Sequence, residues 1–211
     1  MKIVSLLPSS TEIVCKLGFR ENLVGVSHEC DYPLSVKDLP ILTKPRFSPI
    51  ESSQKIDNSV QDLLKKGLSV YEVNTDLLKN LAPDLIITQA QCEACAVSLN
   101  DVKKAVSDWV GNKPDIVSLE PNYLDEVWSD FERVGEKLNS SDSYLKFKSE
   151  IEQRLENLKQ KSQQLSKRPK VVCVEWIDPL MIAANWVPEL VDIAGGINML
   201  SNPGSHSHIF N

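Results

Sequence analysis

The chain has 211 residues, of which 42% are hydrophobic and 25% charged, a composition typical of a globular protein with a sizeable buried core. Its formal net charge is −6 and it has no basic stripe interleaved with aromatic residues, so nucleic acid is excluded as an expected partner. No apolar run is long enough to cross a bilayer, so we expect no transmembrane segment. The first apolar run is short and ends at Pro8, unlike a secretory signal. As written, the sequence predicts a cytoplasmic protein, or a periplasmic or cell-surface one if a leader is missing.

The N-terminal residues predict a strand, a helix and a second strand. Residues 2–7 form an apolar run typical of a buried strand. Ser9 and Glu12 have the spacing of a capping box, which predicts a helix that begins at Ser9 and ends at Gly18. Residues 24–27 predict the next strand. This order favours a parallel pair, which places the turn at Pro8 and Ser9 at the sheet edge where the second strand ends.

The segment that follows the second strand has a dense set of side chains that can bind a ligand or a metal ion. It holds, in order, an imidazole, a carboxylate, a thiol, a second carboxylate and a phenol: His28, Glu29, Cys30, Asp31 and Tyr32. Ligands of open α/β sheets bind beyond the carboxyl ends of the strands. We therefore expect these five side chains to contact a ligand.

The middle of the chain leads to a second cluster of the same kind. It predicts a short strand (39–42), then a loop rich in Pro, Ser and Thr (43–53) and a helix (56–67). An extended segment (68–73) and a short helix capped by Asn74 or Thr75 (74–81) follow. The apolar run 85–88 then predicts a strand, and a loop with Cys92 and Cys95 follows it. We expect this loop and the one after the second strand to meet at one end of one sheet.

The second half of the chain is dominated by a long charged helical pattern. It runs from residue 123 to residue 167 without proline and breaks at residues 139–141, and such a helix can connect two lobes rigidly. Residues 170–174 then predict one strand, which delivers a loop with Glu175, Trp176 and Asp178, and Trp186 precedes a last helix. One strand cannot form a sheet, so this lobe is expected to be incomplete, or else its strand joins the first sheet or a partner. The predicted organisation is an N-terminal α/β lobe (1–121), a connecting helix segment (122–168) and the start of a C-terminal α/β lobe (169–211).

At this point the sequence resembles a known family. Residues 3–12, 24–27 and 82–86 resemble the N-terminal lobe of substrate-binding proteins for cobalamin and iron chelates. Residues 28–33, 92–95, 175–179 and 186–190 resemble a narrower subgroup that is usually labelled cobalamin-binding. The resemblance implies two Rossmann-like α/β lobes with parallel sheets joined by one long helix, and further strands and helices after Gly196. It also implies a binding protein rather than an enzyme, which holds a corrinoid such as cobalamin, or a related metal chelate, between the lobes, for uptake with an ABC permease or for intracellular handling.

A cleft for such a flat ligand needs aromatic and apolar walls with a few polar groups at the rim. We expect Tyr32, Trp176 and Trp186 as walls, acidic rim groups, and His28 as a ligand of the cobalt or iron. The full set of expected ligand-binding residues is Pro8, Ser9, His28, Glu29, Cys30, Asp31, Tyr32, Cys92, Cys95, Glu175, Trp176, Asp178 and Trp186.

The alternative function is that of a zinc or iron metalloprotein or a thiol redox enzyme. His28, Cys30, Cys92 and Cys95 offer four soft ligands, which is enough for a tetrahedral metal ion. Cys92 and Cys95 alone have the spacing of a redox pair. The simplest interpretation remains that His28 is bonded to the backbone and that the thiols are structural.

Overall fold

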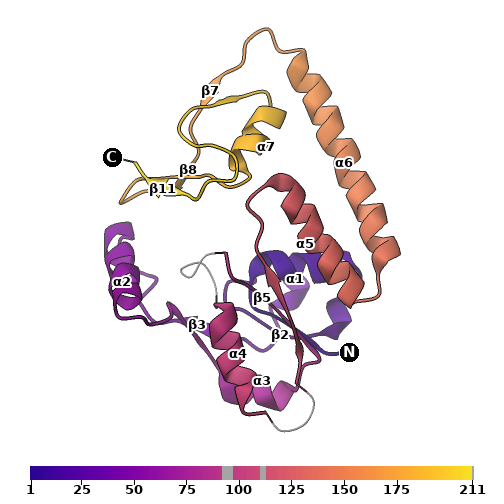
Figure 1. The fold of residues 1–211 in the computed structure, drawn as a ribbon, viewed down its shortest axis with the longest axis vertical. Helices are drawn as coiled ribbons and strands as arrows, with labels where there is room; N and C mark the ends of the chain where they lie inside the picture. Colours follow the sequence, from indigo (N-terminus) through magenta and orange to yellow (C-terminus); the bar gives the residue numbers. More distant parts are fainter. Residues whose placement is uncertain (92–96, 110–112, 211) are drawn as a thin grey trace. The chain divides into compact units, whose positions relative to one another are not determined.

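The structure is a computed structural model, and it describes residues 1–91, 97–109 and 113–210. The chain divides into two compact units, which are described separately. Unit 1 comprises Met1–Glu51 and Asn58–Glu120, and unit 2 comprises Ser52–Asp57 and Pro121–Asn211. Figure 1 follows the chain through both units.

Unit 1 is an α/β unit built on a parallel sheet. Its strands and helices are β1 (Ile3–Ser5), α1 (Pro8–Lys16), β2 (Leu23–Val26), β3 (Thr43–Pro45), β4 (Tyr71–Val73), α3 (Thr75–Leu81), β5 (Leu85–Gln89), α4 (Leu99–Ser107) and β6 (Asp115–Leu119), with short 3₁₀ turns at Arg20–Asn22 and Leu34–Val36. Helix α2 (Ser53–Lys65) begins in the part of the chain assigned to unit 2 and continues in unit 1. The predicted parallel sheet is confirmed, with strand order β2-β1-β5-β6 and every pair parallel.

Helices cover both faces of this sheet, because side chains along a strand point alternately to its two faces. Ser5 faces α1, since its hydroxyl contacts the hydroxyls of Ser10 and Thr11. Val4 and its cross-strand partner Ile86 face the opposite way and join a buried apolar cluster. That cluster is completed by residues of α3, α4 and the loops beside them: Leu6, Leu42, Leu78, Val97, Val102 and Val106.

The predicted capping box at the start of α1 is wrong. The helix begins one residue earlier, at Pro8, with Leu7 as the N-cap residue and no side chain capping it. Proline is favoured in the first helical turn because its fixed φ suits the helix and its missing N–H has no partner to lose there. Ser9 is therefore inside the helix, where its side chain is exposed.

Part of the predicted loop 43–53 is in fact a strand. β3 pairs antiparallel with β4, with Thr43 opposite Val73 and Lys44 opposite Glu72. The preceding residue, Leu42, donates its N–H to the Val26 carbonyl over 2.9 Å, which ties the segment to the edge of the main sheet. The predicted cap of α3 is confirmed at Asn74, whose side chain accepts a hydrogen bond from the Leu77 N–H.

Unit 2 contains the predicted pair of helices and several short strands. Its elements are α5 (Leu124–Lys137), α6 (Ser141–Gln163), β7 (Lys170–Val171), β8 (Val174–Trp176), β9 (Met181–Ile182), α7 (Val187–Ile193), β10 (Ile197–Asn198) and β11 (His208–Ile209). The predicted break is confirmed, because Asn139 adopts a left-handed φ of 52° just after α5. Helices α5 and α6 pack through the stacked rings of Phe131 and Phe147, whose centroids are 5.1 Å apart.

The prediction of a single strand after the long helix is wrong. Unit 2 has a parallel pair, β7 with β10, and an antiparallel sheet of order β11-β9-β8. Most of these strands have two residues, too few to show the alternation that marks a strand in a sequence. No helix in the described ranges has the length and apolar character that a membrane span requires.

Candidate functional site

A small hollow with a cavity volume of about 10 Å³ lies where the parallel strands of unit 1 end. Its lining residues come from the loops after β1 and β2, from β3 and β4, and from the segment before α4: Leu6, Pro8, Ser27, His28, Glu29, Thr43, Tyr71 and Val97. The turn after β1 and the loop after β2 therefore meet at one edge of the sheet, as their order in the chain predicts. Pro8, His28 and Glu29 were expected at a binding site, and the structure brings these three together.

The Thr43 hydroxyl holds His28 in place through two contacts. It accepts a hydrogen bond from the His28 backbone N–H over 3.0 Å, and it lies 2.6 Å from the ring atom Nδ1. It also lies 2.9 Å from the Ser27 hydroxyl, which in turn accepts the Glu29 N–H over 3.3 Å. Ser27 and Thr43 are both buried, so water does not compete readily with these bonds. The loop after β2 is thus fixed by its own Ser27 hydroxyl and by the Thr43 hydroxyl of β3.

The other ring nitrogen of His28 faces a carboxylate. Nε2 lies 3.1 Å from Glu29 Oε1, and the His28 side chain is 19% exposed while that of Glu29 is 56% exposed. The two groups are not aligned as a hydrogen bond, so Nε2 is a buried nitrogen without a hydrogen-bond partner among the described residues. The ring of Tyr71 lies beside the imidazole, with centroids 5.4 Å apart. Burial, assisted by the charge of Glu29, raises the pKa of the Tyr71 phenol, which therefore stays protonated.

Cys30 points away from the ligand side of the loop. Its thiol is 7% exposed and accepts a hydrogen bond from the Thr11 hydroxyl of α1 over 3.1 Å. Burial raises the pKa of the Cys30 thiol, and only the thiolate is an effective nucleophile or metal ligand. The contact with Thr11 instead anchors the loop after β2 to the first helix.

Three more of the residues expected in unit 1 lie outside the hollow. Ser9, Asp31 and Tyr32 are exposed and do not line it, and Tyr32 is 56% exposed. The sequence analysis missed Thr43 and Tyr71, which do line it. The only local signal for Tyr71 was the extended pattern of residues 68–73, and Thr43 had no signal because its segment resembled a loop.

Three of the four expected site residues of unit 2, Glu175, Trp176 and Asp178, lie in β8 or in the turn that follows it. Trp176 is half-buried and donates its indole N–H to the Asp178 carbonyl over 3.0 Å. Glu175 is exposed, and its carboxylate accepts a hydrogen bond from the Ser207 hydroxyl. Trp186 is half-buried and is the N-cap residue of α7.

Cys92 and Cys95 lie outside the described residues, so the predicted metal set stays a prediction for them. Within the described part of the chain, no group of three or more His, Cys, Asp or Glu side chains could hold a metal ion.

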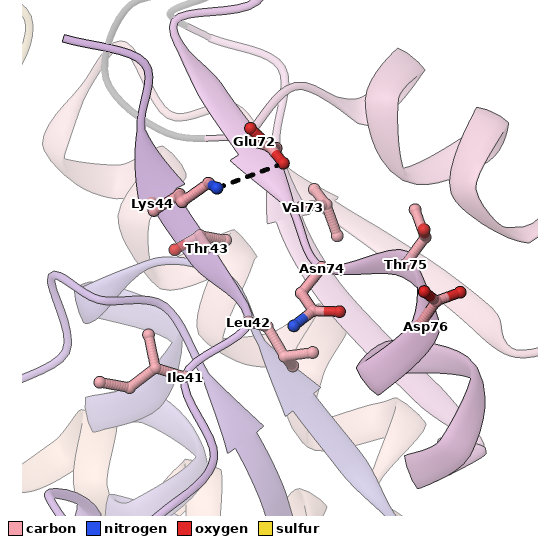
Figure 2. A pocket seen from close by; sticks show the side chains of 9 residues that line it. All are labelled: Ile41, Leu42, Thr43, Lys44, Glu72, Val73, Asn74, Thr75 and Asp76. Carbon is pink, nitrogen blue, oxygen red and sulfur yellow. Dashed lines mark ion pairs between the residues drawn. The ribbon is translucent and has the colours of Figure 1, made fainter.

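A larger groove of about 480 Å³ lies along the β3–β4 ribbon and the start of α3, and Figure 2 shows the side chains that line it. Its lining residues are Ile41, Leu42, Thr43, Lys44, Glu72, Val73, Asn74, Thr75 and Asp76, none of them aromatic. Lys44 and Glu72 are cross-strand partners on β3 and β4; their side chains point toward one another and form an ion pair at 3.5 Å. Despite its size, this groove offers a flat ligand no ring to stack on, and two of its three charged side chains, Lys44 and Glu72, are paired with each other. The smaller hollow is the better candidate site.

Comparisons with known proteins decide the family. A family model described as periplasmic binding protein matches residues 3–209. The chain belongs to this family. No curated protein sequence matches it significantly.

Solved structures of this fold resemble the chain over most of its length. A possible iron-binding protein of Staphylococcus epidermidis has 20% identity and a TM-score of 0.68, over 93% of this chain and 66% of that one. The vitamin B12 binding protein BtuF of Vibrio cholerae has 21% identity and a TM-score of 0.67, over 100% of this chain and 70% of that one. The heme-binding protein RhuT of Roseiflexus has 22% identity and a TM-score of 0.65, over 93% of this chain and 65% of that one. The chain thus spans about two thirds of the length of these proteins, and at such identities the likeness establishes the fold.

Proposed function

We propose that this periplasmic binding protein family member is a solute-binding protein for a flat metal chelate, with a corrinoid such as cobalamin as its ligand, and that it is not an enzyme. The observation that carries the proposal is the hollow at the strand ends of unit 1, where Pro8, His28 and Glu29 meet. The comparisons support it, because similar structures are described as binding vitamin B12, heme and iron. The choice of a corrinoid rests on the resemblance of residues 28–33 and 175–179 to cobalamin-binding proteins.

The size of the hollow limits what unit 1 can hold by itself. Pockets that enclose a drug-sized ligand usually measure about 300–1,000 Å³, and this hollow has only about 10 Å³. A chelate would therefore touch the mouth of the hollow with one side arm, and its ring would lie outside. We propose that the face of the ring is contacted by exposed or half-buried aromatic side chains, namely Tyr32, Trp176 and Trp186, with the carboxylates of Asp31, Glu175 and Asp178 at the rim.

The placement of Cys30 weighs against the metalloprotein and thiol-enzyme alternative. A zinc or iron site using His28 and Cys30 needs both side chains to face one point, whereas the Cys30 thiol is buried and accepts a hydrogen bond from Thr11 of α1, and Cys30 does not line the hollow beside His28. Because Cys92 and Cys95 lie outside the described residues, the measurement below includes bound metal.

The family also bears on partner and location. Similar structures are described as periplasmic, which supports the periplasm or the cell surface and gives no support to the cytoplasmic expectation. We propose an ABC-type permease as the partner that receives the ligand.

Titration tests this function directly. Calorimetry and visible spectroscopy of the purified protein with cyanocobalamin, cobinamide and hemin should give saturable binding of one molecule per chain for at least one of them. Elemental analysis before the titration should find no stoichiometric zinc or iron. Saturable binding by none of the three chelates would refute the proposal, and stoichiometric metal lost on Cys92→Ser would favour the alternative.

A further inference from the structure

The protonation of His28 follows from the hydrogen bonds around Thr43. The Thr43 hydroxyl has one proton and two lone pairs, and one lone pair is used by the His28 backbone N–H. Of its two other neighbours, the Ser27 hydroxyl and His28 Nδ1, one must therefore donate to Thr43 and the other accept from it. If Nδ1 donated, the buried Ser27 hydroxyl would have no acceptor among the described residues. In the consistent arrangement the Ser27 hydroxyl donates to Thr43 and the Thr43 hydroxyl donates to Nδ1, so Nδ1 is an acceptor.

The neutral imidazole then carries its proton on Nε2. The position of Glu29 supports the same assignment, because a lone pair on Nε2 would lie 3.1 Å from the negatively charged Oε1 atom, which is unfavourable even though the two groups are not aligned as a hydrogen bond. A protonated Nε2 cannot ligate a metal, and Nδ1 is occupied by Thr43. His28 therefore acts as a hydrogen-bond donor.

The hollow thus presents a donor and an acceptor side by side. The donor is His28 Nε2–H, which is buried and has no hydrogen-bond partner in the described part of the chain. The acceptor is the Glu29 carboxylate, which forms no ion pair with a described lysine or arginine. A primary carboxamide carries the complementary pair on one carbon atom, a carbonyl oxygen that accepts and an NH₂ group that donates.

We propose that His28 and Glu29 form a subsite for a primary carboxamide, and that this subsite makes the protein select chelates with amide side arms over chelates with carboxylate side arms. The inference rests on the proposed function. A carboxylate arm could accept from His28, but its second oxygen would face the charge of Glu29 without a proton between them. Corrinoids such as cobinamide carry primary carboxamides around the ring, whereas hemes carry carboxylates. The subsite would therefore favour corrinoids over hemes, a choice that the fold alone does not determine.

Two corrinoids with the same ring and metal test this selectivity. Cobinamide has carboxamide arms and cobyrinic acid has the corresponding carboxylates. We expect cobinamide to bind at least about 10-fold more tightly than cobyrinic acid, because a buried polar group that loses its partner is costly. Glu29→Gln removes the charge and should reduce this preference to about 3-fold or less. The matched control Glu21→Gln, at an exposed residue of the first 3₁₀ turn, should leave it unchanged.

His28→Gln tests the role of the imidazole. We expect it to weaken cobinamide binding about 10-fold or more while the visible spectrum of the bound corrinoid stays that of the wild type, because no cobalt–imidazole bond is lost. Circular dichroism should first show that each variant is folded. Binding without a preference for cobinamide, or a spectrum that depends on His28, would overturn the inference and leave the proposed function standing. Failure of cobinamide, cyanocobalamin and hemin alike to bind would overturn both.

Discussion

The Thr43 hydroxyl is the atom whose removal should reveal most about the site. Thr43→Val keeps the shape of the side chain but removes the partner of three groups: the Ser27 hydroxyl, the His28 N–H and His28 Nδ1. Each buried polar group left without a partner costs about 1–3 kcal/mol, and water can reach His28 in part. We therefore expect unit 1 to lose about 2–4 kcal/mol of stability.

Thr43→Ser is the matched control, since it keeps the hydroxyl and loses only a methyl group. Its cost should be about 0.5–1.5 kcal/mol. Because the chain has two compact units, one unfolding curve would mix them. Hydrogen exchange followed by mass spectrometry on peptides from β1 and β2 reports the opening of unit 1 separately. Equal free energies of opening for the two variants would show that the hydroxyl network does not hold the loop, and the assignment of the His28 proton would fall with it.

Three further predictions concern other parts of the chain. Cys30 should react with iodoacetamide at pH 8 at least about 10-fold more slowly in the folded protein than in urea, because burial raises its pKa and thus lowers the thiolate fraction; equal rates would contradict its placement. Gly195→Ala should destabilise unit 2 by about 1–3 kcal/mol in hydrogen exchange, since φ is +85° and the new Cβ would lie 2.8 Å from Ser162 Cβ; an unchanged free energy would refute this packing. Trp176→Ala should weaken corrinoid binding more than Trp109→Ala, whose ring packs against the apolar cluster of unit 1; similar losses in calorimetry would count against Trp176 as a ligand contact.

Where a local pattern is strong, the sequence predicted the structure well. The strand Leu85–Gln89, the two-helix segment with its break near Asn139, and the Asn74 cap of α3 all follow from periodicity or from one residue's chemistry. The errors have local causes too. Pro8 starts α1 where Ser9 had the sequence pattern of a cap, and the two-residue strands of unit 2 are too short for any periodicity.

By itself the sequence determined that the loop after β2 emerges at the binding edge of a parallel sheet, because strand order and the helix between two strands are local information. Only the tertiary structure decided what that loop presents. Thr43, 15 residues from His28, orients the imidazole, and Thr11, 19 residues from Cys30, holds the thiol inward. Such hydrogen bonds depend on which strand and which helix lie beside the loop, and local sequence patterns do not predict these neighbours.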